Sequence, residues 1–355
     1  MMSEPLDAVS ILQQATAEHA SDIFIVAGLS LSYKVNGVLH SIGDRLMPND
    51  TEVLIRQIYE LANKRNIEHF MECGDDDFSF AIPGLSRFRV STYKQRGSLA
   101  SVIRVIAFEL PKPQELSIPS FVLQMTDFTK GMVLVTGPAG SGKSTTLACL
   151  VDKINSTRSN HIITLEDPLE FLHRHKQSIV SQREISTDTD NYLTALRAAL
   201  RQSPDVILLG EMRDHETIQT AMTAAETGHL VLSSLHTIGA ANTISRIIDV
   251  FDPSQQRQIA VQLSMVLKAV ISQQLVPTVD GSMIPAFEIM VMTPAISNMI
   301  RDNKVHQIDG MIYTSAKDDM ISMDNSLLQL YRRGIITRDT VLRYCTNGEM
   351  TKKKL

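Results

Sequence analysis

Hydrophobic and polar positions over residues 1–108 change between a helical and a strand-like period. Leu6, Val9, Leu12 and Ala15 recur at the spacing of an amphipathic helix. The pattern then predicts strands at Ile23–Ala27, Leu31–Val35, Val38–Ile42, Phe78–Ile82, Arg87–Tyr93 and Leu99–Ile106. A helix over Asp50–Asn66 is predicted between the third and the fourth of these strands. Asn36-Gly37 and Pro83-Gly84 indicate turns. We therefore expect a small N-terminal α+β domain over residues 1–108.

The remainder of the chain has a different pattern. Pro111, Pro113 and Pro119 favour extended backbone, so residues 109–119 are predicted to link two domains. Apolar runs alternate with helical segments after Ser120, at Met132–Thr136, His161–Leu165, Val206–Leu209 and Leu230–Leu235. Such alternation is typical of an α/β domain with a parallel sheet covered on both faces. We expect an α/β domain over 120–355 whose last part, from about residue 294, is helical.

Composition and charge exclude several classes of protein. The net charge is -5, which does not favour a nucleic-acid-coating protein, and Lys352–Lys354 is predicted to be a solvated tail. The three cysteines, Cys73, Cys149 and Cys345, are far apart and predict neither a disulfide framework nor a zinc site. We see no signal peptide and no apolar run near the ~20 residues that span a bilayer. We therefore expect a cytoplasmic protein that reaches a membrane only through partners.

A phosphate-binding loop is the most specific motif in the chain. Gly137-Pro138-Ala139-Gly140-Ser141-Gly142-Lys143-Ser144-Thr145 fits GxxxxGK[ST] between a predicted strand and a predicted helix. Its glycines let backbone N–H groups approach phosphates, and the helix N-terminus adds partial positive charge. Lys143 is expected to reach the β- and γ-phosphates of ATP, and the Ser144 hydroxyl to bind Mg²⁺.

Two acidic residues follow predicted core strands. Glu211 comes after Val206–Leu209, on a strand that we expect beside the P-loop strand, and Glu166 ends His161–Leu165. Ligands bind at the carboxyl edge of such sheets, so both acids are candidates for holding Mg²⁺ or polarising the attacking water. Many P-loop proteins have an Asp where this chain has Gly210, so we assign the water to Glu211. His229 and His236 flank Leu230–Leu235, and taken alone each is better explained by a structural role than by a role in sensing the γ-phosphate.

In addition to the P-loop, the chain resembles the superfamily of hexameric secretion and pilus ATPases, and within it the type IV pilus retraction motors. The resemblance covers nearly the whole chain and implies a PAS-like N-terminal domain followed by a RecA-like ATPase core. It is carried, in order along the sequence, by Ala20–Ile23, Arg87–Val90, Ile163–Phe171, Leu196–Arg201, Gly210–Asp214, Glu226–Leu230 and Leu235–Thr237.

The resemblance implies a role for each matching residue. Glu211 would be the catalytic glutamate and Glu166 an auxiliary acid near Mg²⁺. His229 would lie near the γ-phosphate, with His236 supporting the site. The four arginines that match are Arg89 and Arg104, which would reach over the nucleotide, and Arg197 and Arg201, of which one would face a neighbouring subunit's nucleotide.

Features of the two ends of the chain distinguish the retraction branch from the other members of the superfamily. Assembly and secretion members typically carry an additional N-terminal region and a four-cysteine zinc insert, and this chain has neither, so we expect no zinc. The retraction branch carries a C-terminal motif close to AIRNLIRE, which matches Ala295–Asp302 here, with Ser297 in place of the expected arginine and Asp302 in place of glutamate. Phe24 also replaces the usual histidine after Ser-Asp-Ile.

These features together predict a cytoplasmic homo-hexamer that hydrolyses ATP with Mg²⁺ and powers pilus retraction and twitching-type motility. Its expected partner is the platform protein at the inner face of the cytoplasmic membrane, and a second pilus ATPase is a further candidate. Two alternatives stay open at this point. One is a pilus assembly, type II secretion or DNA-uptake ATPase, and the other is an accessory nucleotide-binding ring subunit with weak hydrolysis.

Overall fold

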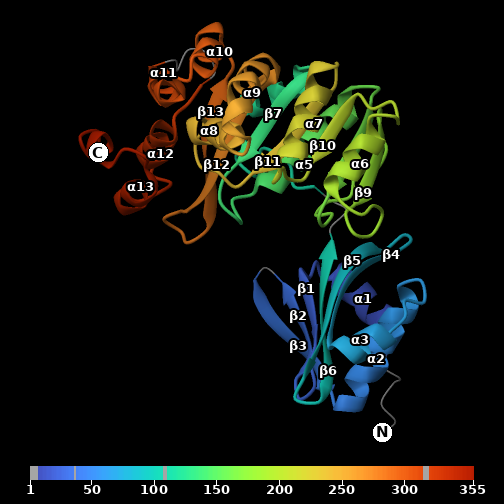
Figure 1. Cartoon of the computed structure of the whole chain (residues 1–355). Coiled ribbons are helices and arrows are strands. Elements are labelled where there is room, and N and C mark those ends of the chain that lie inside the picture. Colours follow the sequence, from blue (N-terminus) through green and yellow to red (C-terminus); the bar gives the residue numbers. More distant parts are fainter. Residues whose placement is uncertain (1–6, 36, 107–109, 315–319) are drawn as a thin grey trace. The chain divides into compact units, whose positions relative to one another are not determined.

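The computed structural model describes residues 7–35, 37–106, 110–314 and 320–355 (Figure 1). The predicted helix residue Leu6 and turn residue Asn36 lie outside these ranges, as do residues 107–109 at the predicted domain boundary. The chain divides into two compact units, the first of residues 1–109 with 170–172 and the second of residues 110–169 with 173–355.

The first unit contains one antiparallel sheet of six strands in the order β3-β2-β1-β6-β5-β4. The strands are β1 (Asp22–Ile25), β2 (Ser30–Val35), β3 (Val38–Arg45), β4 (Asp75–Ile82), β5 (Ser86–Gln95) and β6 (Ser98–Ile106). The helices are α1 (Ala8–Ala17), α2 (Pro48–Leu61) and α3 (Glu68–Cys73). Helices and strands share one apolar core that includes Leu12, Leu54, Phe70 and Phe88. The α+β prediction is confirmed here strand by strand.

Details at element ends differ from the predicted bounds. The predicted helix over Asp50–Asn66 begins at Pro48 and ends at Leu61, because Asn63 and Lys64 take positive φ values of 56° and 57°. The short helix α3 was not predicted. Gly37 has φ +81° beside the β2–β3 pairing, which is the left-handed backbone that a tight hairpin turn needs.

The second unit is built on a mixed sheet of seven strands in the order β13-β12-β7-β11-β10-β8-β9. Its strands are β7 (Gly131–Thr136), β8 (His161–Glu166), β9 (Ile179–Glu184), β10 (Val206–Leu209), β11 (Leu230–Leu235), β12 (Leu267–Pro277) and β13 (Met283–Val291). Only the β12–β13 pair is antiparallel. The four predicted core strands are confirmed, whereas β9, β12 and β13 were not predicted.

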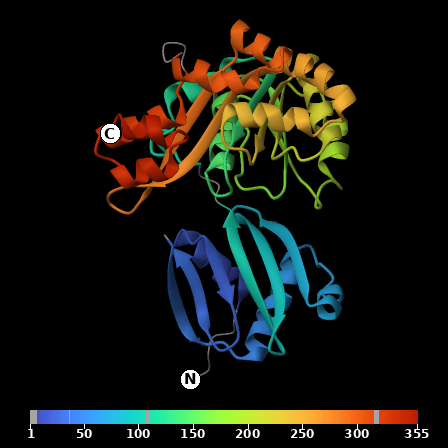
Figure 2. The ribbon, with the colours of Figure 1, turned by 60° about the vertical axis from the view of Figure 1, so that its left-hand side comes forward.

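Helices cover both faces of this sheet (Figures 1 and 2). Val133, Val135 and Leu208 face α4 (Ser120–Gln124) and α5 (Lys143–Thr157). The alternate strand residues Leu134, Ile207 and Leu209 face a second core, to which the following helices contribute: α6 (Tyr192–Ala199), α7 (His215–Glu226), α8 (Ala240–Asp249), α9 (Pro253–Val266), α10 (Pro294–Arg301) and α11 (Ile308–Thr314). The predicted α/β class is confirmed.

The end of the chain is helical, as predicted. After α10 and α11 come α12 (Met323–Arg332), α13 (Arg338–Tyr344) and α14 (Gly348–Lys352). Of these, α12 and α13 pack with β12 and β13 around Leu327 and Val341. No helix within the described ranges is long and apolar enough to cross a membrane.

Candidate active site

The P-loop joins β7 to α5 at the carboxyl edge of the sheet. Gly137 has φ +143°, and a Cβ atom there would lie 2.1 Å from the Gln273 backbone oxygen, so no other residue fits. Gly142, at φ +87°, is the residue from which α5 starts. The Lys143 side chain is buried, and its Nζ atom donates hydrogen bonds of 2.9 Å to the carbonyl oxygens of Gly137 and Pro138. The predicted residues thus form a glycine-rich phosphate-binding loop, and hydrogen bonds to its backbone hold the Lys143 side chain beside it.

Gln273 of β12 supports this loop, and sequence reasoning missed it. Its side chain is 3% exposed, and its Oε1 accepts a 2.7 Å hydrogen bond from the Thr146 hydroxyl on α5. Its Nε2 lies 2.8 Å from the place of a Cβ at Gly142. The β12 strand pairs in parallel with β7 through Ser272 and Thr136, which brings Gln273 to the loop. Nothing local in the sequence marks a glutamine 127 residues beyond Thr146 as its partner.

Glu211 follows β10 at the same edge of the sheet. The prediction that β10 lies directly beside the P-loop strand is wrong, because β11 separates β10 from β7. His236 follows β11 and therefore lies between the ends of β7 and β10. The Gly137 N–H of the P-loop donates a hydrogen bond to the carbonyl of Leu235, the residue before His236. The His236 Nε2 atom is 3.5 Å from one Glu211 oxygen, and Arg213 is 2.6 Å from the other.

The strand end at Gly210 explains why an Asp is absent there. A Cβ at Gly210 would lie 2.9 Å from the Tyr192 hydroxyl and 3.3 Å from the Leu165 carbonyl oxygen. Tyr192, the first residue of α6, therefore fills the space of a side chain at position 210. Burial raises the pKa of Tyr192, and the negative charges of Glu211, Asp167 and Glu166 raise it further. This tyrosine is a second residue that sequence reasoning missed.

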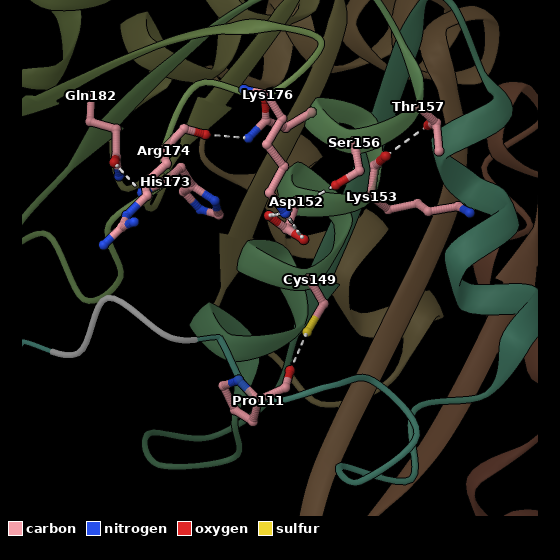
Figure 3. A network of polar contacts seen from close by, with 11 residues as sticks. Pro111, Cys149, Asp152, Lys153, Ser156, Thr157, His173, Arg174, Lys176 and Gln182 are labelled. Carbon is pink, nitrogen blue, oxygen red and sulfur yellow. Dashed lines mark hydrogen bonds and ion pairs between the residues drawn. The ribbon is translucent and has the colours of Figure 1, made fainter. Parts of the chain in front are cut away.

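Glu166 is the last residue of β8. This strand pairs in parallel with β10, with Leu165 opposite Leu209, so Glu166 and Glu211 lie at the ends of neighbouring strands. The Gln182 side chain joins Glu166 to the segment that follows it. Its Nε2 is 3.4 Å from a Glu166 oxygen, and its Oε1 accepts a 2.7 Å hydrogen bond from the His173 backbone N–H. Figure 3 shows Gln182 above His173.

The segment from His173 to Ser178 is tied to the P-loop helix (Figure 3). Asn155 of α5 is fully buried and donates to the Arg174 carbonyl at 2.7 Å, while its Oδ1 accepts from the Lys176 N–H at 3.1 Å. Lys176 also forms an ion pair of 2.7 Å with Asp152 on the same helix. Through these contacts α5 positions the chain that follows Glu166.

The two histidines lie at opposite ends of β11. His229 precedes the strand, and its carbonyl accepts a hydrogen bond from the N–H of Gly131 at the start of β7. The length of β7, about 16 Å at ~3.3 Å per residue, therefore separates it from the P-loop of the same subunit. Within the subunit, the structure therefore contradicts the prediction that His229 lies near the γ-phosphate, whereas His236 lies at the P-loop edge of the sheet. The His229 Nδ1 atom is 2.9 Å from the Ala224 carbonyl oxygen.

The four predicted arginines lie on other elements than the strand ends that carry these acids. Arg89 and Arg104 face each other across β5 and β6, and Arg104 pairs with Asp22 at 3.1 Å. Arg197 is exposed on α6, 3.7 Å from Glu216. Arg201 follows the end of that helix and donates to the Arg197 carbonyl at 2.9 Å. Their nucleotide-binding roles stay predictions.

A largely parallel sheet whose carboxyl edge carries a P-loop, two strand-end glutamates and a histidine defines a P-loop nucleotide hydrolase. Comparison with known proteins specifies the family. The model of the family described as type II/IV secretion system protein matches residues 4–284. This chain belongs to that family and, like its members, is an ATPase, as the sequence predicts.

Individual relatives match nearly the full length. The type IV pilus retraction ATPase PilT of Pseudomonas aeruginosa is 42% identical over 334 residues, which cover 94% of this chain and 96% of that protein. A twitching motility protein of Neisseria gonorrhoeae is 40% identical and covers 96% of this chain and 91% of its own length. The crystal structure of the pilus retraction motor PilT with bound ADP has a TM-score of 0.89 at 41% identity, covering 98% of this chain and 99% of its own.

Proposed function

We propose that this chain is the ATP-driven motor that retracts a type IV pilus, and that it works as a homo-hexameric ring. The observation that supports this most is the full-length similarity to retraction ATPases, which extends through the C-terminal helices. In such a ring, one of the two exposed arginines Arg197 and Arg201 would face a neighbouring subunit's nucleotide. The partner would be a pilus platform protein at the cytoplasmic face of the membrane.

The residues of the site each fit a step of ATP hydrolysis. The P-loop glycines and the start of α5 would bind the β- and γ-phosphates, with Lys143 neutralising their charge. Glu211 would polarise the attacking water, and His236, 3.5 Å from it, would orient its carboxylate toward the γ-phosphate. Arg213, whose side chain is 77% exposed, contributes less because water screens its charge.

The donor atoms at this edge also fit Mg²⁺, which prefers oxygen ligands. The Ser144 hydroxyl would bind it, with the Glu166 and Glu211 carboxylates close to it or to its waters. When bound with ATP, the ion would supply positive charge against the charge that develops on the phosphate oxygens. Glu166 is fixed for this role by Gln182, which connects it to the segment held by α5.

Deletion of the gene in its own host tests the motor role. We expect cells that keep surface pili but lose pilus shortening and movement over surfaces. The wild-type gene should restore both, and a Glu211→Gln gene, expressed at the same level, should restore neither. Loss of the pili themselves would instead identify an assembly ATPase.

One observation favours the accessory-subunit alternative. Ser297 stands where the retraction motif has an arginine, and its hydroxyl donates to the Ser264 carbonyl at 3.1 Å and accepts from Arg301 at 3.2 Å. The position therefore helps to fasten α10 to α9. If the Glu211→Gln gene restores movement as well as the wild type does, the chain acts as a scaffold beside another motor.

A further inference from the structure

The residue that follows β10 is Gly210, which has no side chain. Gly210 stands directly before Glu211, where many P-loop proteins have an Asp. The backbone conformation does not require a glycine at this position, because φ of Gly210 lies outside the left-handed range that favours glycine. What requires a glycine is space: a Cβ would be 2.9 Å from the Tyr192 hydroxyl, closer than real Cβ atoms come to a neighbour.

The ring of Tyr192 is firmly held. It is the first residue of α6, and the helix is capped just before it by Asn191, whose Oδ1 accepts a 2.9 Å hydrogen bond from the Thr194 N–H. The ring packs against the core between the sheet and its helices. Gly210 itself is fixed, since its N–H donates to the Leu165 carbonyl at 2.7 Å and its carbonyl accepts from the Ser234 hydroxyl at 2.6 Å. The hydroxyl is thus brought to the strand end by two rigid elements.

The surroundings of the hydroxyl are acidic. Burial and the charges of Glu211, Asp167 and Glu166 all raise the pKa of Tyr192, against the smaller opposing effect of Arg213. The phenol therefore stays protonated at neutral pH and can donate its proton to a carboxylate or to a water held between carboxylates. A hydrogen bond to a charged acceptor is about twice as strong as one between neutral groups.

We propose that Tyr192 is a positioning residue of the hydrolysis site, whose hydroxyl takes the place of the side chain absent at Gly210 and donates a hydrogen bond to a water held between the acids Glu211 and Glu166. This inference rests on the proposed role of Glu211 in polarising water. The tyrosine fixes the direction of the Glu211 carboxylate and leaves nucleotide binding to the P-loop, so its removal affects turnover and spares affinity.

Steady-state ATPase assays of the full chain with Mg²⁺ test the proposal. Tyr192→Phe keeps the ring and removes only the hydroxyl, so we expect kcat to fall about tenfold, the loss of one hydrogen bond to a charged group, with KM for ATP changed less than about twofold. Tyr331→Phe is the matched control, because this half-buried tyrosine belongs to the C-terminal core around Leu327. Equal kcat values for Tyr192→Phe and the wild type would overturn the proposal.

A second pair of variants tests the geometry. Gly210→Ala should lower kcat, because its methyl group and the Tyr192 hydroxyl need the same space. Gly210→Ala should lower kcat by a smaller factor in the Tyr192→Phe background, because the 2.9 Å contact with the hydroxyl is then gone and the 3.3 Å contact with the Leu165 carbonyl oxygen remains. If Gly210→Ala lowers kcat by the same factor in both backgrounds, the hydroxyl does not occupy that space and the proposal fails.

Glu211→Gln separates this inference from the proposed function. If Glu211→Gln abolishes turnover and Tyr192→Phe matches the wild type, only the role of Tyr192 is refuted. If Glu211→Gln turns over normally, the proposed function of Glu211 fails, and the tyrosine's role through it fails as well. If Tyr192→Phe slows the wild type but not the Glu211→Gln variant, the two residues act as one unit, as proposed.

Discussion

The hydrogen bond between Gln273 and Thr146 is expected to hold the P-loop helix to the sheet. Gln273→Ala removes the acceptor of this 2.7 Å hydrogen bond. The Thr146 hydroxyl then lacks its acceptor, and Thr146 is only 1% exposed. A buried polar group left unsatisfied costs about 1–3 kcal/mol. For a domain of this size, 1 kcal/mol shifts Tm by roughly 2–4 °C. We therefore expect Tm to fall by about 2–12 °C and ATP affinity to weaken.

A double-mutant cycle measures this contact. Thermal unfolding without nucleotide is followed for Gln273→Ala, Thr146→Val and the double variant. The losses should be less than additive, by about 1 kcal/mol, because either change alone breaks the bond. Gln274→Ala is the control, since the next residue of the strand points to the other face of the sheet and should change the free energy of unfolding by less than about 0.5 kcal/mol. Additive losses, or equal effects of the two glutamine variants, would refute the reasoning.

Two further predictions concern histidines. His236→Ala should lower kcat at least about tenfold, because it removes a neighbour of Glu211, whereas His229→Ala should change kcat less; the reverse order in ATPase assays would contradict the assignment. Burial lowers the pKa of His173 from 6.5 to about 4. The unfolded chain therefore binds this proton first, so the stabilising contribution is complete above pH 6.5 and is lost as the pH falls toward 4. His173→Gln should flatten the dependence of Tm on pH across this range, and an unchanged slope would exclude the effect.

Much of the fold could be predicted because local patterns and tertiary structure agree. The buried strands β7, β8, β10 and β11 are short apolar runs followed by loop residues, which is typical of a parallel sheet covered on both faces. The edge strand β9 contains Ser181, Gln182 and Arg183, so its apolar pattern is too weak to identify it. The long β12 strand carries buried polar residues such as Gln273, whose partners lie far away in sequence.

The active site shows the same division between local and distant information. The P-loop and both glutamates could be found because each follows a predicted strand. The same rule, that ligands gather at the carboxyl ends of parallel strands, would have favoured His236 over His229, since only His236 follows its strand. The role of Tyr192 could not be predicted, because the space it fills beside Gly210 exists only once α6 packs on the sheet.

The most direct test of the central claim is the steady-state ATPase activity of the purified protein beside Glu211→Gln, with the particle mass determined in the same buffer. We predict Mg²⁺-dependent turnover from a particle of six subunits and a loss of at least about 100-fold in the variant, the typical effect of removing a group that activates the attacking water. Turnover that is indifferent to Glu211, or a particle that stays monomeric with ATP, would contradict the account.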